Sequence, residues 1–174
     1  NPLLTKDDYA NILDAYTKQV LLIKNNVCDN QKNGIKAPTL KKYLEGKFIF
    51  LKQDLDSKEK CLDFIIDVLE KDNAVYDEFR EAIYKREKLG VTCLDTGVAL
   101  PHADPQTIKK SRIILLTLKH PVDWGGTLVS LIVVTAFPEE EMNQIRDVIN
   151  ELYGEMSFSN NYIFKYATTT GDVN

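Results

Sequence analysis

Helical periodicity dominates the pattern of apolar and polar positions in this 174-residue chain. In several stretches, apolar residues recur three and four positions apart, the spacing that places side chains on one face of an α-helix. Ser57, Asn73 and Asp104 stand where side-chain caps begin helices, and Pro105 suits the first helical position after Asp104. The pattern predicts helices over residues 7–25, 39–44, 58–70, 75–87, 104–110, 138–153 and 160–166.

Continuous apolar runs between these helices predict strands. Strands that are apolar along their whole length are typical of sheets with helices on both faces. Because helices and strands also interleave, the predicted fold class is α/β, with a small mixed β-sheet flanked by helices on both faces. The segment 119–126, KHPVDWGG, predicts a turn-rich connection. The predicted strands span residues 48–51, 98–100, 112–118 and 128–135.

An asparagine-rich stretch separates the first helix from the rest of the chain. Residues 25–38, NNVCDNQKNGIKAP, predict a loop or linker. We therefore expect an N-terminal helix and linker over 1–37 and a main domain over 38–174. The helix has two interpretations: it packs against the main domain, or it is the tail of an upstream domain. The start at Asn1 rather than Met favours a fragment of a longer protein.

Composition limits the classes of function. The chain is 44% hydrophobic and 28% charged, enough for one core and too short for two ordinary domains. A net charge of -4 argues against direct contact with nucleic acid. Three cysteines without zinc-ligand spacing favour free thiols and a cytoplasmic location. No apolar run approaches the roughly 18 residues of a membrane span, so no membrane partner is expected.

One of the two histidines stands in a setting that favours chemistry. His102 follows the predicted strand 98–100 and a proline, which ends the strand. It also precedes the predicted helix start at Asp104, where unpaired N–H groups favour an anion such as phosphate. A phosphohistidine needs such a strand-end imidazole beside an anion site. We interpret the other histidine, His120, as a loop residue.

The segment REKLGVTCLDTGVALPHADP, residues 86–105, resembles the active-site region of the enzyme IIA domain of the bacterial sugar phosphotransferase system, fructose/mannitol type. The shared pattern is an Arg-Glu pair, a threonine, and a Gly-X-Ala-X-Pro-His run that ends in the phosphorylated histidine. The resemblance runs from about residue 38 to near the C-terminus. It implies the mannitol/fructose-type fold and no metal or organic cofactor. The matching residues are Arg86, Glu87, Thr92, Gly97, Ala99, Pro101 and His102.

The resemblance implies roles for individual residues. His102 would accept the phosphoryl group on Nε2, Arg86 would bind the phosphoryl oxygens, and Thr92 would hydrogen-bond near the ring. The residues alone allow other roles, because Arg86 could compensate a helix dipole and Thr92 could satisfy local backbone donors. Glu141 stands where transporter-type members have a second histidine. Its carboxylate would either repel the phosphoryl group or polarise the imidazole.

These features favour a phosphoryl-accepting domain that HPr, the phosphocarrier protein of the sugar system, phosphorylates on His102. The resemblance extends to domains at the C-terminus of sugar-operon activators and antiterminators with paired phosphotransferase regulation domains (PRDs). The partners would then be HPr and the upstream domains of the same regulator. One alternative is a IIA component of a fructose/mannitol-type transporter that passes phosphate to enzyme IIB. Another is an interaction module that is not phosphorylated. Whether the domain is a phosphotransferase or a sensor stays open.

Overall fold

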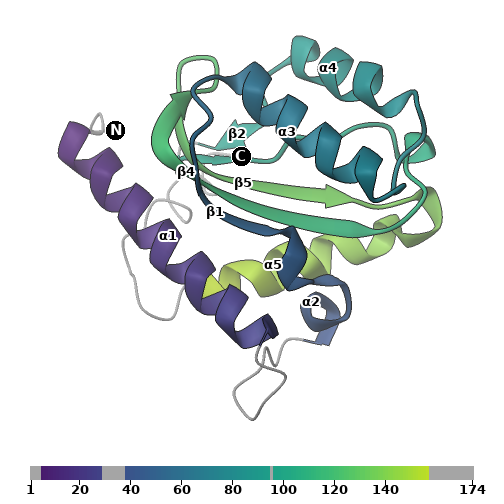
Figure 1. Cartoon of the computed structure of the whole chain (residues 1–174), viewed down its shortest axis with the longest axis horizontal. Helices are drawn as coiled ribbons and strands as arrows, with labels where there is room; N and C mark the ends of the chain where they lie inside the picture. The colour runs from purple at the N-terminus through teal and green to yellow at the C-terminus, as the bar shows by residue number, and fades with distance from the viewer. Residues whose placement is uncertain (1–4, 29–37, 95, 157–174) are drawn as a thin grey trace.

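A β-sheet with helices on both faces forms the protein, as Figure 1 shows. The computed structural model describes residues 5–28, 38–94 and 96–156, so the predicted helix at 160–166 lies outside the described residues. The strands are β1 (Ile49–Gln53), β2 (Cys93–Leu94), β3 (Val98–Ala99), β4 (Arg112–Asp123) and β5 (Leu128–Ala136). The helices are α1 (Lys6–Cys28), α2 (Pro38–Tyr43), α3 (Lys58–Lys71), α4 (Phe79–Leu89) and α5 (Ile145–Met156), with 3-10 turns η1 (Gly46–Phe48), η2 (Pro105–Thr107) and η3 (Glu139–Gln144).

The sheet is mixed, as predicted. Within the described residues its strand order is β1-β4-β5-β3-β2. β1 runs parallel to β4 and β3 parallel to β5, whereas the β4–β5 and β2–β3 pairs are antiparallel. Strands β3 and β5 therefore end at the same edge of the sheet, and β4 begins there. The segment after β3, which carries His102, lies at this edge beside the segment after β5.

Alternation along the central strands divides the interior into two apolar cores. Ile114 and Leu116 of β4 pack with α3 and α4 on one face of the sheet. Ile113 and Leu115 point to the other face and pack with α1, α2 and α5. This arrangement explains why these strands are apolar along their whole length, because neither face meets water.

The start of α4 differs from the prediction. Asn73 does not cap this helix: its φ is 54°, and it follows the end of α3. The N–H groups of Asn73 and Ala74 bind carbonyls in the last turn of α3, which is the Schellman arrangement that ends helices. Val75 then pairs with Ile108 in an isolated β-bridge, and α4 begins only at Phe79.

The predicted helix over 104–110 is also wrong in extent. The Asp104 carboxylate does accept the N–H of Gln106, at 2.9 Å, so the predicted cap forms. It begins only the three-residue 3-10 turn η2, because the chain turns away at Ile108 to form the β-bridge with Val75. Such a short turn lacks the dipole of a helix, so the anion attraction expected there loses its main source.

Two other element boundaries differ from the predicted ones. β4 passes through an irregularity after Thr117 and continues to Asp123, so the predicted connection shortens to 124–127. His120 therefore lies in an exposed part of a strand rather than in a loop. The predicted helix over 138–153 is divided into η3 and α5, which begins at Ile145.

Helix α1 shares a core with the rest of the described chain. Ile12, Tyr16 and Val20 are buried in the core that also contains Leu115 of β4. The Lys24 ammonium adds a hydrogen bond of 2.9 Å to a carbonyl of β1. The proposed boundary near residue 37 stays a prediction, because 29–37 lie outside the described residues. No helix of the described segments is long and apolar enough to span a bilayer.

Candidate functional site

The His102 side chain is exposed, and a main-chain atom orients its ring. Nδ1 lies 2.8 Å from the carbonyl oxygen of Leu100. A carbonyl only accepts hydrogen bonds, so Nδ1 carries the proton and Nε2 keeps its lone pair. The structure thus gives a physical reason for the nitrogen that the sequence resemblance implied. In this tautomer Nε2 is the ring nitrogen whose lone pair is available for reaction.

A hollow of about 270 Å³ opens beside this imidazole, and its walls are mostly apolar. They come from the segment that carries His102, the end of β5, η3 and α5. Met142 of η3 is 41% exposed, so apolar surface reaches the rim. This surface suits a large partner that buries it on docking. The other lining residues are Leu100, Ala103, Pro105, Ile108, Thr135, Phe137, Ile145 and Ile149.

Arg86 lies on the other side of the segment that follows His102. Its Nη1 donates a hydrogen bond of 3.0 Å to the carbonyl of Gly90, just beyond the end of α4. The same side chain lines a hollow of about 400 Å³ together with Asp104 and Thr107. The structure therefore brings Arg86 to the segment that carries His102 without pairing the two side chains. The helix-end role that the sequence left open is the one seen here.

A buried polar network supports the Leu100 carbonyl that orients the ring. The Thr92 hydroxyl donates to the Glu87 carboxylate, which is only 6% exposed. The Thr92 carbonyl accepts the N–H of Leu100 at 2.6 Å. The Lys58 ammonium lies 3.1 Å from Oε2 of Glu87, at an angle that makes an ion pair but no hydrogen bond. Thr92 is thus connected to His102 through the backbone of Leu100, whose N–H it binds and whose carbonyl contacts the ring.

We expect Lys58→Met to destabilise the fold by about 2–4 kcal/mol, because it leaves the buried Glu87 carboxylate without its counter-charge. Urea denaturation followed by circular dichroism measures the change. Lys60→Met is the matched control: Lys60 pairs with Asp56 on the surface, so its loss should matter much less. The double variant Lys58→Met/Glu87→Gln should recover part of the loss. An unchanged midpoint for Lys58→Met would contradict this account of the ion pair.

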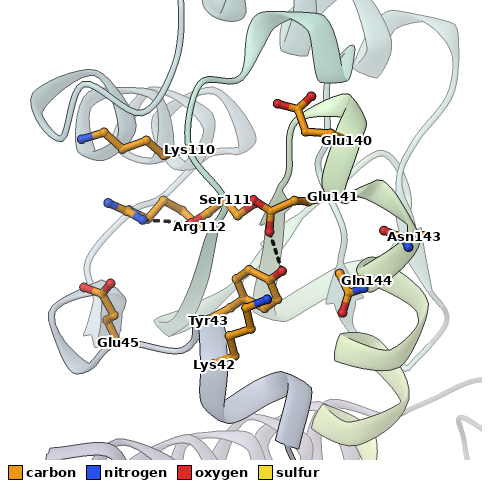
Figure 2. Close-up of a pocket in the computed structure, with 10 residues that line it drawn as sticks. All are labelled: Lys42, Tyr43, Glu45, Lys110, Ser111, Arg112, Glu140, Glu141, Asn143 and Gln144. Atoms are coloured by element: carbon orange, nitrogen blue, oxygen red, sulfur yellow. Dashed lines mark hydrogen bonds between the residues drawn. The ribbon is translucent and has the colours of Figure 1, made fainter.

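Glu141 faces away from His102. Its carboxylate accepts a hydrogen bond of 2.5 Å from the Tyr43 hydroxyl, as Figure 2 shows. This bond raises the pKa of Tyr43 to about 12, since ionisation would bring two negative charges together. Both side chains line a polar hollow of about 600 Å³ between α2, η3 and the start of β4. In the described chain, the neighbour Met142, not Glu141, lines the hollow beside His102.

Sequence reasoning missed two parts of the site. It gave Lys58 no role beyond the first turn of a helix, although Lys58 holds the buried Glu87 carboxylate. The available signal was Glu87 of the Arg-Glu pair. It lies on the apolar face of its helix, where a carboxylate needs a partner. It also missed Tyr16 of α1, whose hydroxyl donates to the carbonyl of Thr96. No local pattern signals a contact across 80 residues of chain.

The described residues thus combine an oriented, exposed imidazole after β3 with an arginine near the segment that follows it. Residues 42–162 match the family described as phosphoenolpyruvate-dependent sugar phosphotransferase system, EIIA 2, and the chain belongs to this family. The match leaves α1 outside it. The family membership confirms the resemblance found in residues 86–105.

Relatives fall among transcription regulators and sugar-system components. The chain is 31% identical over 104 residues to the transcriptional regulator ManR of Bacillus subtilis, covering 60% of this chain and 16% of ManR. It is 26% identical over 107 residues to the probable licABCH operon regulator of the same organism, covering 62% of this chain and 17% of that protein. The chain thus spans about a sixth of these curated relatives.

A solved structure confirms the fold class. The complex of mannitol enzyme IIA with phosphorylated mannitol enzyme IIB from Escherichia coli matches with a TM-score of 0.56 and 20% identity. The match covers 72% of this chain and 97% of the solved chain. The chain is therefore an enzyme IIA domain of type 2 with the mannitol-type fold.

Proposed function

We propose that this domain accepts a phosphoryl group from phospho-HPr on Nε2 of His102 and serves as the regulatory domain of a sugar-operon transcription regulator. The observation that carries the proposal is the bond of 2.8 Å between Nδ1 and the Leu100 carbonyl, which leaves Nε2 as the exposed nucleophile. Imidazole suits the step because it is largely neutral in water near pH 7.

The proposed reaction is an in-line displacement at phosphorus. The Nε2 lone pair of His102 forms the new N–P bond while the N–P bond of the donor phosphohistidine breaks and returns its electron pair to the donor ring. Nδ1 keeps its proton and its bond to Leu100. Arg86 exchanges the Gly90 carbonyl for phosphoryl oxygens, which its planar fork of donors matches better. No metal or organic cofactor takes part.

The surroundings of His102 support a protein as the donor. The hollow beside the ring is lined mainly by apolar side chains, and the exposed Met142 extends this surface. A small phosphorylated metabolite would instead need several polar groups converging on it. HPr is accordingly the proposed donor, with the upstream domains of the same regulator as the proposed intramolecular partners.

Two observations favour a regulator over a transporter component. The relatives ManR and the licABCH regulator are both transcription regulators. The chain also has only one other histidine, His120, which lies roughly 20 Å along β4 from the His102 edge of the sheet. A second imidazole beside His102 would assist onward transfer. The transporter alternative, in which a IIB domain receives the phosphate, has the solved IIA–IIB complex in its favour.

A pulse and chase experiment tests the proposal. Radiolabelled phosphoenolpyruvate, enzyme I and HPr should load one phosphate that is labile in acid and stable in alkali, as a phosphohistidine is. After removal of the donors, the label should persist when candidate IIB domains are added, because a signal needs a long lifetime. Rapid discharge to one IIB domain would establish the transporter alternative. If the domain acquires no label, the remaining interpretation is an interaction module that is not phosphorylated.

A pair of variants sharpens this test. Met142→His would place an imidazole in the hollow beside His102, so it should speed discharge to a IIB domain. Glu141→His occupies the position of the second histidine in transporter-type members, but its side chain faces Tyr43 and should change discharge little. The opposite order of effects would show that Glu141, as the sequence comparison suggested, replaces the second histidine in space.

A further inference from the structure

Helix α1 contacts the turn that leads into the strand before His102. Tyr16 is only 1% exposed, and its hydroxyl donates a hydrogen bond of 3.0 Å to the Thr96 carbonyl. Ile12, one helical turn earlier, lies against Gly97: a methyl group at Gly97 would sit 3.6 Å from its side chain. α1 therefore makes one polar contact with Thr96 and one apolar contact with Gly97 of this turn.

The turn is tied firmly to the sheet. Gly97 has a φ of 85°, a conformation that glycine adopts without strain. Its carbonyl accepts the N–H groups of Ser130 and Leu131 at 2.8 and 3.2 Å. Val98 and Ala99 follow as β3 and pair with β5. A shift of the turn is thus transmitted along β3 rather than absorbed in a loose segment.

The strand ends one residue before Leu100, whose carbonyl orients His102. The Leu100 N–H is bound by the Thr92 carbonyl, and the Leu100 carbonyl is bound by Nδ1 of His102. The path from the Tyr16 hydroxyl to the imidazole therefore consists of hydrogen bonds and of the backbone of a strand that is paired in the sheet. Five residues separate Thr96, which α1 holds, from His102, the proposed phosphoryl acceptor.

We infer that α1 positions the phosphoryl-accepting histidine through the Tyr16–Thr96 contact, so that docking of α1 on the sheet and phosphorylation of His102 are coupled. Tyr16 is a positioning residue and touches no reacting atom. The inference rests on the proposed function. It adds that α1 is the element whose docking responds to phosphorylation of His102. α1 precedes the matched residues 42–162, so this contact supplements the part shared with the family. Because coupling is reciprocal at equilibrium, phosphorylation also strengthens the docking of α1.

Tyr16→Phe tests the contact, because it keeps the buried ring and removes only the hydroxyl. Nitrogen NMR of the full chain reports the tautomer of His102 without any phosphoryl donor. In the wild type, Nδ1 should be protonated and Nε2 bare; the variant should move toward the tautomer protonated on Nε2, which a solvated histidine side chain prefers. With phospho-HPr, kcat is the rate of His102 phosphorylation at saturating donor, and KM is the donor concentration at half that rate. This kcat should fall about three- to tenfold, the worth of one buried hydrogen bond, at unchanged KM.

Tyr84→Phe is the matched control. Tyr84 also donates hydrogen bonds, to Asp63 and the Glu59 carbonyl, but it belongs to α4 on the opposite face of the sheet. It should leave the tautomer and kcat unchanged. Ile12→Val is a milder change at the same turn and should shift both readouts in the direction of Tyr16→Phe, by less. Ile12→Val can also replace Tyr16→Phe as the test if Tyr16→Phe folds poorly.

Hydrogen exchange of the α1 amides tests the coupling in the reverse direction. Exchange should slow when His102 is phosphorylated, and this slowing should be lost in Tyr16→Phe. A folded Tyr16→Phe with wild-type tautomer and kcat would overturn the inference, as would α1 exchange that ignores phosphorylation. If phospho-HPr fails to label the wild type while Tyr16→Phe still shifts the tautomer, the proposed function fails and the positioning role stands.

Discussion

We expect that replacing His102 by alanine abolishes the transfer of phosphate from phospho-HPr to this domain. The reason is that Nε2 of this ring is the proposed nucleophile, and among the described residues no neighbouring side chain in its hollow offers another nitrogen. His102→Asn is the sharper variant. Its amide nitrogen sits close to the place of Nδ1 and can still donate to the Leu100 carbonyl, so the loop keeps its bond while the nucleophile is lost. Labelling with radioactive phosphoenolpyruvate, enzyme I and HPr measures the loss.

The second histidine provides the control for this result. His120 is exposed on β4, so His120→Ala should fold normally and accept phosphate as the wild type does. Label that persists in His102→Ala, or that disappears in His120→Ala, would contradict the assignment. Mass spectrometry of the labelled chain under alkaline conditions would then locate the true acceptor.

We expect Arg86→Ala to slow phosphorylation of His102 more than about tenfold, with little effect on folding. The guanidinium lines the same hollow as Asp104 and Thr107 of the segment after His102, and Nη1 donates one hydrogen bond to the Gly90 carbonyl. Pairing with the phosphoryl oxygens in the transition state would lower the barrier, and tenfold corresponds to about 1.4 kcal/mol. Rapid-mixing kinetics with phospho-HPr measures the rate. Arg86→Lys should restore it only in part, because an ammonium lacks the bidentate fork.

Arg80→Ala is the matched control on the same helix. The Arg80 side chain pairs with Asp67 and Glu70 of α3 at 3.0 and 3.1 Å, away from the hollow that Arg86 lines. It removes the same charge from the domain and should leave the rate unchanged. Equal rates for Arg86→Ala and the wild type would assign Arg86 to the helix end alone.

Much of the fold could be predicted from the sequence because apolar periodicity reports burial directly. The helix at α3 shows this well: Ser57 caps it, and Leu62, Ile65 and Leu69 fill the core as their spacing indicates. The errors arose where a tertiary contact competes with a local preference. Asp104 and Pro105 are good helix starters, yet the bridge between Ile108 and Val75 ends the helix after a single turn.

The candidate site, like the fold, could be predicted from the sequence only in part. The motif located His102, Thr92 and Arg86 near one another in sequence, and the structure places all three around β3 and the segment after it. Side-chain directions were beyond prediction. Glu141 turns toward Tyr43 because a phenol hydroxyl is available there, and a pattern in one segment carries no information about a partner 98 residues away.

The bond between His102 and the Leu100 carbonyl has an evolutionary consequence. Its acceptor is a main-chain atom, which every amino acid at position 100 supplies. The side chains around the hollow, Met142 and Ile145 among them, can therefore mutate to suit a new docking partner without disturbing the protonation pattern of the ring. The proposed nucleophile and the proposed docking surface can thus change independently of each other, so that new partners can be accommodated while the orientation of the ring is kept.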